Sequence, residues 1–161
     1  MPLDKHALLA ALRAQIAADL DALVSSQKRA HEGATHEEAR PESDKDTRAT
    51  EASYVARGLA ERVRSLELAA RRLASFALRD FGPDEPIRTG ALIHVEDQGG
   101  EHHYFMAPAG GGLTITLAGQ AVGIITPRSP LGQALLGART DDDLELETPR
   151  GPRELTVLAV T

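Results

Sequence analysis

The sequence predicts an α+β protein, in which an N-terminal antiparallel helical hairpin precedes an antiparallel β-sheet domain with one short helix. Two observations predict the hairpin. Apolar residues recur every three or four positions in residues 4–38 and again in residues 47–81, and a turn-forming stretch separates the two patterns. The sheet is predicted by a third observation, because the chain beyond residue 82 consists of short β-type runs separated by Gly and Pro.

The first helix is expected from Asp4 to about Glu38, where Ala, Leu, Gln, Lys and Glu dominate. These residues are good helix formers. The apolar stripe thins after Val24. Its members are Leu9, Leu12, Ile16, Leu20, Leu23, Gln27 and Ala30.

The turn of the hairpin is predicted near residues 40–51. Pro41 cannot continue a helix, because it lacks an N–H group and clashes with the preceding turn. Ser43, Asp44 and Asp46 are suited to cap the N-terminus of the next helix. The turn therefore places four carboxylates at or near its apex, namely Glu42, Asp44, Asp46 and Glu51.

The second helix is expected from about Thr47 to Phe81, with apolar residues at a spacing close to a heptad. A short turn between two such stripes makes the helices antiparallel neighbours, which predicts a coiled-coil rod about 50 Å long. Gly82 and Pro83 end the helix. We therefore expect a hairpin domain at residues 1–81 and a second domain at residues 82–161.

Six strands and one short helix are expected in the second domain. The helix spans Ser129 to Leu136, with Ser129 as its N-cap and Pro130 at its first position. The strands are expected at residues 91–97, 102–107, 113–117, 122–126, 143–148 and 154–160.

Composition narrows the class of protein. The chain has no Cys and therefore no disulfide framework or thiolate metal site. No apolar run is long enough to cross a membrane and no signal-peptide pattern opens the chain, so we expect a cytoplasmic protein. Residues 1–81 carry 13 basic and 13 acidic residues, whereas residues 82–161 carry 5 and 11. The carboxylates near the turn fit a hairpin that delivers acidic groups to a partner, or a solvated helix with many ion pairs.

One motif resembles a known family. Residues 125–137 read I-T-P-R-S-P-L-G-Q-A-L-L-G, which closely resembles the S-P-L-G-x-A-L-L-G signature of the Gre-type bacterial transcript cleavage factors. The flanking residues 90–97 and 144–157 are also similar to the beginning and the end of the C-terminal domain of that family. With the hairpin, the resemblance covers essentially the whole chain.

The resemblance implies an FKBP-like domain that docks on RNA polymerase, and a rod that enters the secondary channel of the polymerase. In the family, carboxylates at the tip of the rod help to hold a second Mg²⁺ in the polymerase active site, where backtracked RNA is hydrolysed. The protein would then be an accessory factor and not an enzyme. It would have no cofactor of its own, share Mg²⁺ with the polymerase, meet the RNA 3′ end only inside the complex, bind no membrane and be a monomer. The docking residues implied are Ser129, Pro130, Leu131 and Gly132.

The tip departs from the family pattern. The cleavage factors carry an acidic pair in the sequence D-L-x-E-N-A-E-Y, and an ungapped alignment places Thr47 and Thr50 at those two positions. Threonine cannot supply anionic oxygens. Asp44 and Asp46 are then the candidates for holding the Mg²⁺ of the polymerase, with Glu42 and Glu51 as second choices.

Two other functions fit the same residues. Residues 44–50 are similar to the tip sequence D-x-x-D-R-A-T of DksA-like factors, which implies a non-cleaving regulator of initiation. A coiled-coil oligomerisation protein with no polymerase partner is the third possibility. The histidines predict no metal site in the free protein, because His102 and His103 point to opposite faces of a strand and His94 is isolated.

Overall fold

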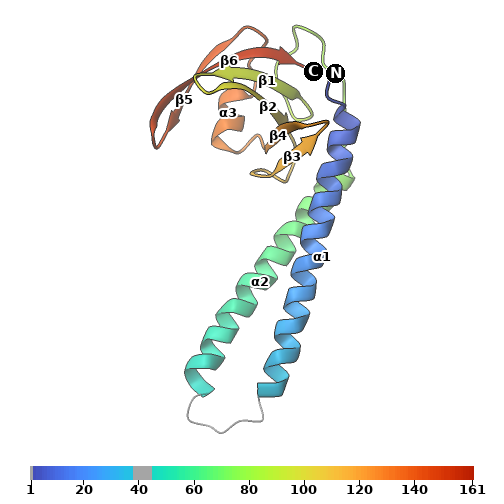
Figure 1. The fold of residues 1–161 in the computed structure, drawn as a ribbon, viewed down its shortest axis with the longest axis vertical. Coiled ribbons are helices and arrows are strands. Elements are labelled where there is room, and N and C mark those ends of the chain that lie inside the picture. Colours follow the sequence, from blue (N-terminus) through green and yellow to red (C-terminus); the bar gives the residue numbers. More distant parts are fainter. Residues whose placement is uncertain (1, 38–44) are drawn as a thin grey trace. The chain divides into compact units, whose positions relative to one another are not determined.

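The computed structural model describes residues 2–37 and 45–161 of the 161-residue chain (Figure 1). It divides into two compact units. One contains the residues up to Arg13 together with Arg72–Thr161, and the other contains Ala14–Arg71.

Two helices form the predicted hairpin, α1 (Lys5–Glu37) and α2 (Lys45–Ala74). Asp4 begins α1, because its carboxylate accepts a hydrogen bond from the backbone N–H of His6 at 2.9 Å. Leu8 and Leu12 near the start of α1 are fully buried. The helices run in opposite directions, as the apolar stripes predict (Figure 1).

Helix α2 ends at Ala74, seven residues before the predicted end at Phe81. No Gly or Pro stops it. Instead, the Arg13 guanidinium donates to the carbonyl of Leu73 from Nε at 2.9 Å and from Nη2 at 2.7 Å, and to the carbonyl of Phe76 at 3.0 Å. These bonds satisfy carbonyls that a helix end leaves without partners. A side chain sixty residues away thus replaces the next helical turn.

Six strands in the described part of the chain form one sheet, in the order β3-β4-β2-β1-β6-β5. The predicted strands are all present, but β2 and β4 each begin two residues earlier than expected and β6 begins three residues earlier. The strands are β1 (Leu92–Asp97), β2 (Gly100–Met106), β3 (Thr114–Leu117), β4 (Gln120–Ile125), β5 (Asp143–Thr148) and β6 (Gly151–Val160).

The sheet is mixed and not wholly antiparallel as expected, because β2 and β4 run parallel. The chain places β3 at the edge and returns through a hairpin, so that β4 lies beside β2 in the same direction. The pairing sets Tyr104 opposite Gly123. A Cβ on Gly123 would come within 2.8 Å of the Tyr104 ring, so only glycine leaves room for the ring.

The main core lies on the face of the sheet that carries α3 (Pro130–Leu135). Its buried members are Ile87, Ala91, Ile93, Val95, Met106, Ile125, Leu135, Ala138, Leu155, Val157 and Val160. On the other face, Leu92 and Phe105 are also buried. Leu12 of α1 packs close to Gly110, where an added Cβ would lie 3.1 Å from Leu12 Cδ1.

The start of α3 is held by a compact set of polar contacts. The Ser129 hydroxyl accepts a hydrogen bond from the N–H of Gly132 at 3.1 Å and donates one to the carbonyl of Thr126 at 2.8 Å. Pro130 occupies the first turn, where a missing N–H costs nothing. Gly132 is pressed against the loop, since a Cβ there would lie 1.8 Å from the Thr126 carbonyl oxygen. The predicted cap and helix are therefore confirmed, and the glycine is a steric requirement.

A second polar set ties the β1–β2 turn to β6. The Asp97 carboxylate is 7% exposed and accepts hydrogen bonds from the N–H of Gly99 at 2.7 Å and from the Arg153 guanidinium. His102 Nε2 lies 3.1 Å from Oδ1 of Asp97, the same oxygen that accepts the Gly99 hydrogen bond. Burial acts to raise the pKa of Asp97, but the Gly99 N–H, Arg153 and His102 together hold it below its usual value. The folded protein therefore favours the ionised carboxylate.

None of the helices in the described residues is long and apolar enough to span a membrane.

We predict that Gly132→Ala destabilises the sheet domain by about 3 kcal/mol, because the methyl group must displace the Thr126 carbonyl or break the Ser129 cap. Urea titration followed through the NMR amide signals of the sheet measures the loss. Gly82→Ala is the matched control, because an added Cβ there meets nothing within 4 Å. Equal stability of the two variants would contradict the steric role of Gly132.

Asp97→Asn is expected to cost about 1–2 kcal/mol at pH 7, because it removes a charged hydrogen-bond acceptor from Arg153 and Gly99. The folded pKa of Asp97 lies below the unfolded value of about 3.9, so its contribution is full above that pH and is lost as the pH falls through the folded pKa. The wild type should then lose more stability than the Asn variant between pH 6 and pH 3.

Denaturation at several pH values measures this difference. Glu96→Gln is the control, since Glu96 is the exposed neighbour of Asp97 on the other face of β1. A wild type and an Asp97→Asn variant with parallel pH profiles would show that Asp97 contributes no charge-dependent stability.

Candidate functional site

The residues around α3 fall into two groups. Some shape the loop, and others are exposed to solvent. Of the four predicted docking residues, Pro130 is exposed, Ser129 and Leu131 are half-buried, and Gly132 is buried. Ser129 and Gly132 are engaged with Thr126 and with each other. Their place in the signature is thus explained by the geometry of the loop.

Three further residues are exposed beside Pro130, and sequence reasoning missed them. Gln133 and Leu136 follow Pro130 at intervals of three along the short helix, and Arg128 precedes it. Leu136 is 46% exposed, which is unusual for a large apolar side chain. A check of the three-residue spacing in the motif would have found this face. We name Arg128, Pro130, Gln133 and Leu136 the α3 surface.

The α3 surface stands on a rigid base. Leu135 is fully buried in the core, and the N–H of Gly137 donates to the carbonyl of Ile87 at 2.9 Å. Gly137 ends the helix with φ of 86°, a conformation that favours glycine. Leu136 is thus an exposed apolar side chain on a fixed backbone, and such side chains often mark protein interaction sites.

The predicted acidic tip lies only partly within the described residues. Glu42 and Asp44 lie outside them, and Asp46 lies in the first turn of α2. Glu51 is exposed on α2, in the second turn. The structure therefore does not bring the four carboxylates together as a described site.

The first turns of α2 present hydroxyl groups and an aromatic ring. Thr47, Thr50 and Tyr54 are exposed, and Tyr54 is exposed by 68%. Thr50, Tyr54 and Arg57 line a shallow hollow on this helix. The two positions that would carry the acidic pair of a cleavage factor are thus on the helix surface and hold neutral side chains.

The expectation that His94 is isolated is wrong. His94 is not isolated, because its ring stacks on that of His103 with centroids 4.3 Å apart, and its Nε2 lies 2.7 Å from Glu101 Oε2. Burial lowers the pKa of His103 below its usual value, and the neighbouring His94 adds to this effect. His102 contacts Asp97 on the opposite face, as the alternation of a strand predicts. Among residues 2–37 and 45–161, no three His, Asp or Glu side chains are placed to hold a metal ion together.

The C-terminal part of the chain matches a known family. Residues 113–161 match the family described as transcription elongation factor, GreA/GreB, C-terminal domain. The transcription inhibitor protein Gfh1 of Thermus thermophilus is 34% identical over 91 residues, which are 55% of each chain. An uncharacterized protein of Mycobacterium bovis is 44% identical over 45 residues, or 28% of each chain. The chain thus spans about half the length of the Thermus relative that it matches.

Solved structures resemble the chain over a longer range, but more weakly. The crystal structure of Thermus thermophilus Gfh1 is 25% identical and superposes with a TM-score of 0.38, covering 92% of this chain and 94% of that one. The GreA/GreB factor of Nitrosomonas europaea is 18% identical with a TM-score of 0.36, covering 60% of this chain and 79% of the other.

The matched segment contains the capped loop, α3, the α3 surface and the last two strands of the sheet. Residues 113–161 of the chain thus match the GreA/GreB C-terminal domain, and a longer part of the chain is similar to Gfh1.

Proposed function

We propose that this protein binds RNA polymerase and acts in its secondary channel as a regulator that inhibits transcription without cleaving RNA. The domain of residues 82–161 docks on the polymerase through the α3 surface, and the hairpin enters the channel. The protein is an accessory factor and has no active site of its own.

The neutral side chains at the two aligned positions favour inhibition over cleavage. Stimulated cleavage requires carboxylates that hold a second Mg²⁺, and the two aligned positions on α2 are Thr47 and Thr50. A neutral hydroxyl is a weak substitute for a carboxylate as a Mg²⁺ ligand. The relative with 34% identity is named a transcription inhibitor, which supports the same choice.

Docking through the α3 surface is supported by its exposure and by its fixed geometry. Leu136 is the one large apolar side chain of that surface, and exposed apolar side chains surrounded by polar residues are typical of protein interfaces. Arg128 adds a cation at the edge, suited to an acidic group of the partner.

Stimulated cleavage is the second candidate function, favoured by Asp44 and Asp46 in the sequence. Two carboxylates separated by one residue can share one hydrated Mg²⁺. In that case Asp44 and Asp46, with Glu42 or Glu51, replace the missing acidic pair.

For the docking surface, we predict that Leu136→Asp weakens binding to RNA polymerase at least tenfold, because it places a charge in an apolar contact. Affinity of the purified protein for core polymerase, measured by biolayer interferometry, checks this. Thr116→Asp is the matched control, since it adds the same charge at an exposed position on the edge strand β3. Unchanged binding of a folded Leu136→Asp variant would show that the α3 surface is not the docking surface.

For the tip, we predict that the wild type slows RNA synthesis and releases no 3′ RNA fragments from a backtracked elongation complex supplied with Mg²⁺. The double variant Thr47→Asp/Thr50→Glu should release fragments, because it restores the acidic pair at the aligned positions. Ala49→Asp/Ala52→Glu adds the same charges at the same spacing elsewhere on the exposed helix and should release none.

The same assay separates the two candidate functions. Fragment release by the wild type, abolished in Asp44→Ala/Asp46→Ala with polymerase binding retained, would establish the cleavage function instead. Absence of any polymerase binding by the wild type would overturn both and leave the oligomerisation role.

A further inference from the structure

Strand β5 lies at one end of the sheet and pairs with β6 alone among the strands of the described residues. It is six residues long and contains no proline, and its register against β6 runs from Asp143 to Thr148 without a shift. Proteins commonly protect an edge strand by making it short, by a proline or a bulge, or by covering it. The other edge strand, β3, has only four residues. Strand β5 is therefore the edge with room for a further strand.

The proline of β6 shows which residues of β5 have free backbone groups. In an antiparallel pair, opposite residues alternate between pairs that exchange two backbone hydrogen bonds and pairs that exchange none. Glu147 lies opposite Pro152, which has no N–H group, so this pair exchanges none. By alternation, the same holds for Glu145 and Asp143. The N–H and C=O groups of these three residues thus point away from β6, toward the open side of the edge.

The same three residues carry carboxylates, and all three are exposed. They share one face of the strand, because Leu144 and Leu146 between them pack on the core from the other face. Glu145 lies directly opposite Glu154 of β6, which is also exposed. Like charges at opposite positions destabilise two paired strands, and the side chains are closest in a pair that exchanges no hydrogen bonds. The β5–β6 hairpin therefore contains a repulsion that a cation would relieve.

The described part of the chain supplies no such cation. Within residues 2–37 and 45–161, no Lys, Arg or His side chain forms an ion pair with Glu145 or Glu154. The two bases of the hairpin lie elsewhere, since Arg153 pairs with Asp97 on the opposite face of the sheet and Arg150 is in the turn. The negative charge of this face is thus available to a partner.

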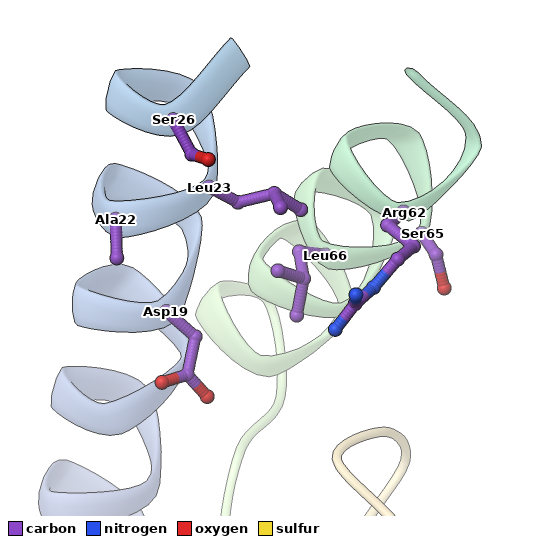
Figure 2. A pocket seen from close by; sticks show the side chains of 7 residues that line it. All are labelled: Asp19, Ala22, Leu23, Ser26, Arg62, Ser65 and Leu66. Atoms are coloured by element: carbon purple, nitrogen blue, oxygen red, sulfur yellow. The ribbon is translucent and has the colours of Figure 1, made fainter. Parts of the chain in front are cut away.

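A shallow hollow of about 380 Å³ lies between the two strands. Its lining contains three carboxylates and no base, and consists of Asp143, Leu144, Glu145, Glu154, Leu155 and Thr156. The groove of about 570 Å³ between α1 and α2 differs in charge, because Asp19 and Arg62 both line it (Figure 2). That groove favours neither sign of charge, whereas the hollow beside β5 favours a positively charged side chain.

We propose that β5 is a docking edge for an extended, basic segment of a partner protein, which adds to the sheet as a further strand. The free backbone groups of Asp143, Glu145 and Glu147 bond to the added strand. Lys or Arg side chains at alternate positions of that strand meet the carboxylates. A second copy of β5 does not fit, because it brings acidic side chains against acidic ones. The carboxylates thus reject acidic strands and accept basic ones.

NMR titration of the full chain with synthetic peptides tests the proposal. The probe is a capped peptide of alternating Lys and Val with the same length as β5. On binding, the backbone amides of Asp143, Glu145 and Glu147 should exchange with water about tenfold more slowly, because their N–H groups gain hydrogen-bond acceptors. The same peptide methylated at every backbone nitrogen keeps its charges but cannot pair as a strand. Equal protection by the methylated peptide would overturn strand addition.

Two charge reversals test the carboxylates. Glu145→Lys should weaken binding of the Lys–Val peptide about tenfold, because it places a cation at the centre of the edge. The substitution also sets a cation opposite Glu154, which favours the pairing of β5 with β6. Asp21→Lys is the matched control, since it changes the net charge equally at an exposed position of α1. Equal weakening by both variants would show attraction to the net charge alone, and would overturn the docking edge.

Two further outcomes would contradict the proposal. Absence of binding by the Lys–Val peptide would show that the carboxylates only keep the edge free of other strands. Protection of the same amides that rises with the concentration of the protein alone would identify a second copy of the chain as the occupant. Neither outcome bears on the α3 surface, so the inference stands or falls separately from the proposed function.

Discussion

The bonds from Arg13 to the carbonyls of Leu73 and Phe76 determine where the hairpin ends and the sheet domain begins. A helix end must satisfy its last carbonyls, and the guanidinium with its several donors does so from the side. Because α2 stops at Ala74, the chain can turn after it. Lys5 Nζ donates a further hydrogen bond, of 2.7 Å, to the carbonyl of Arg79 in the segment that follows the helix. The first turns of α1 therefore belong physically to the unit that contains the sheet.

The signature around α3 combines two physical roles in consecutive residues. Ser129 and Gly132 make the loop possible, since one caps the helix and the other allows the Thr126 carbonyl to approach. Pro130 and Leu136 are exposed on the structure that results. The buried glycine and the half-buried serine fix the backbone beneath this surface through hydrogen bonds and steric contact. The positions of the exposed side chains are therefore well defined.

The two ends of the hairpin differ in how many of their side chains are buried. The first turns of α1 are held by buried leucines, whereas residues 47–58 of α2 are exposed and contain several good helix formers such as Ala, Glu and Arg. A long apolar seam would make the hairpin more stable, but it is not what this sequence encodes.

Local information in the sequence determined the helices, the strand positions and the capped loop. Stripes of apolar residues, Ser129 followed by Pro130, and runs between glycines act over a few residues, so they are legible without a structure. Only the tertiary structure decided the end of α2, the parallel pairing of β2 with β4, the stacking of His94 on His103, and which residues of the signature are exposed. Each of these depends on groups distant in sequence or on burial by neighbouring elements, and neither is written in a local pattern.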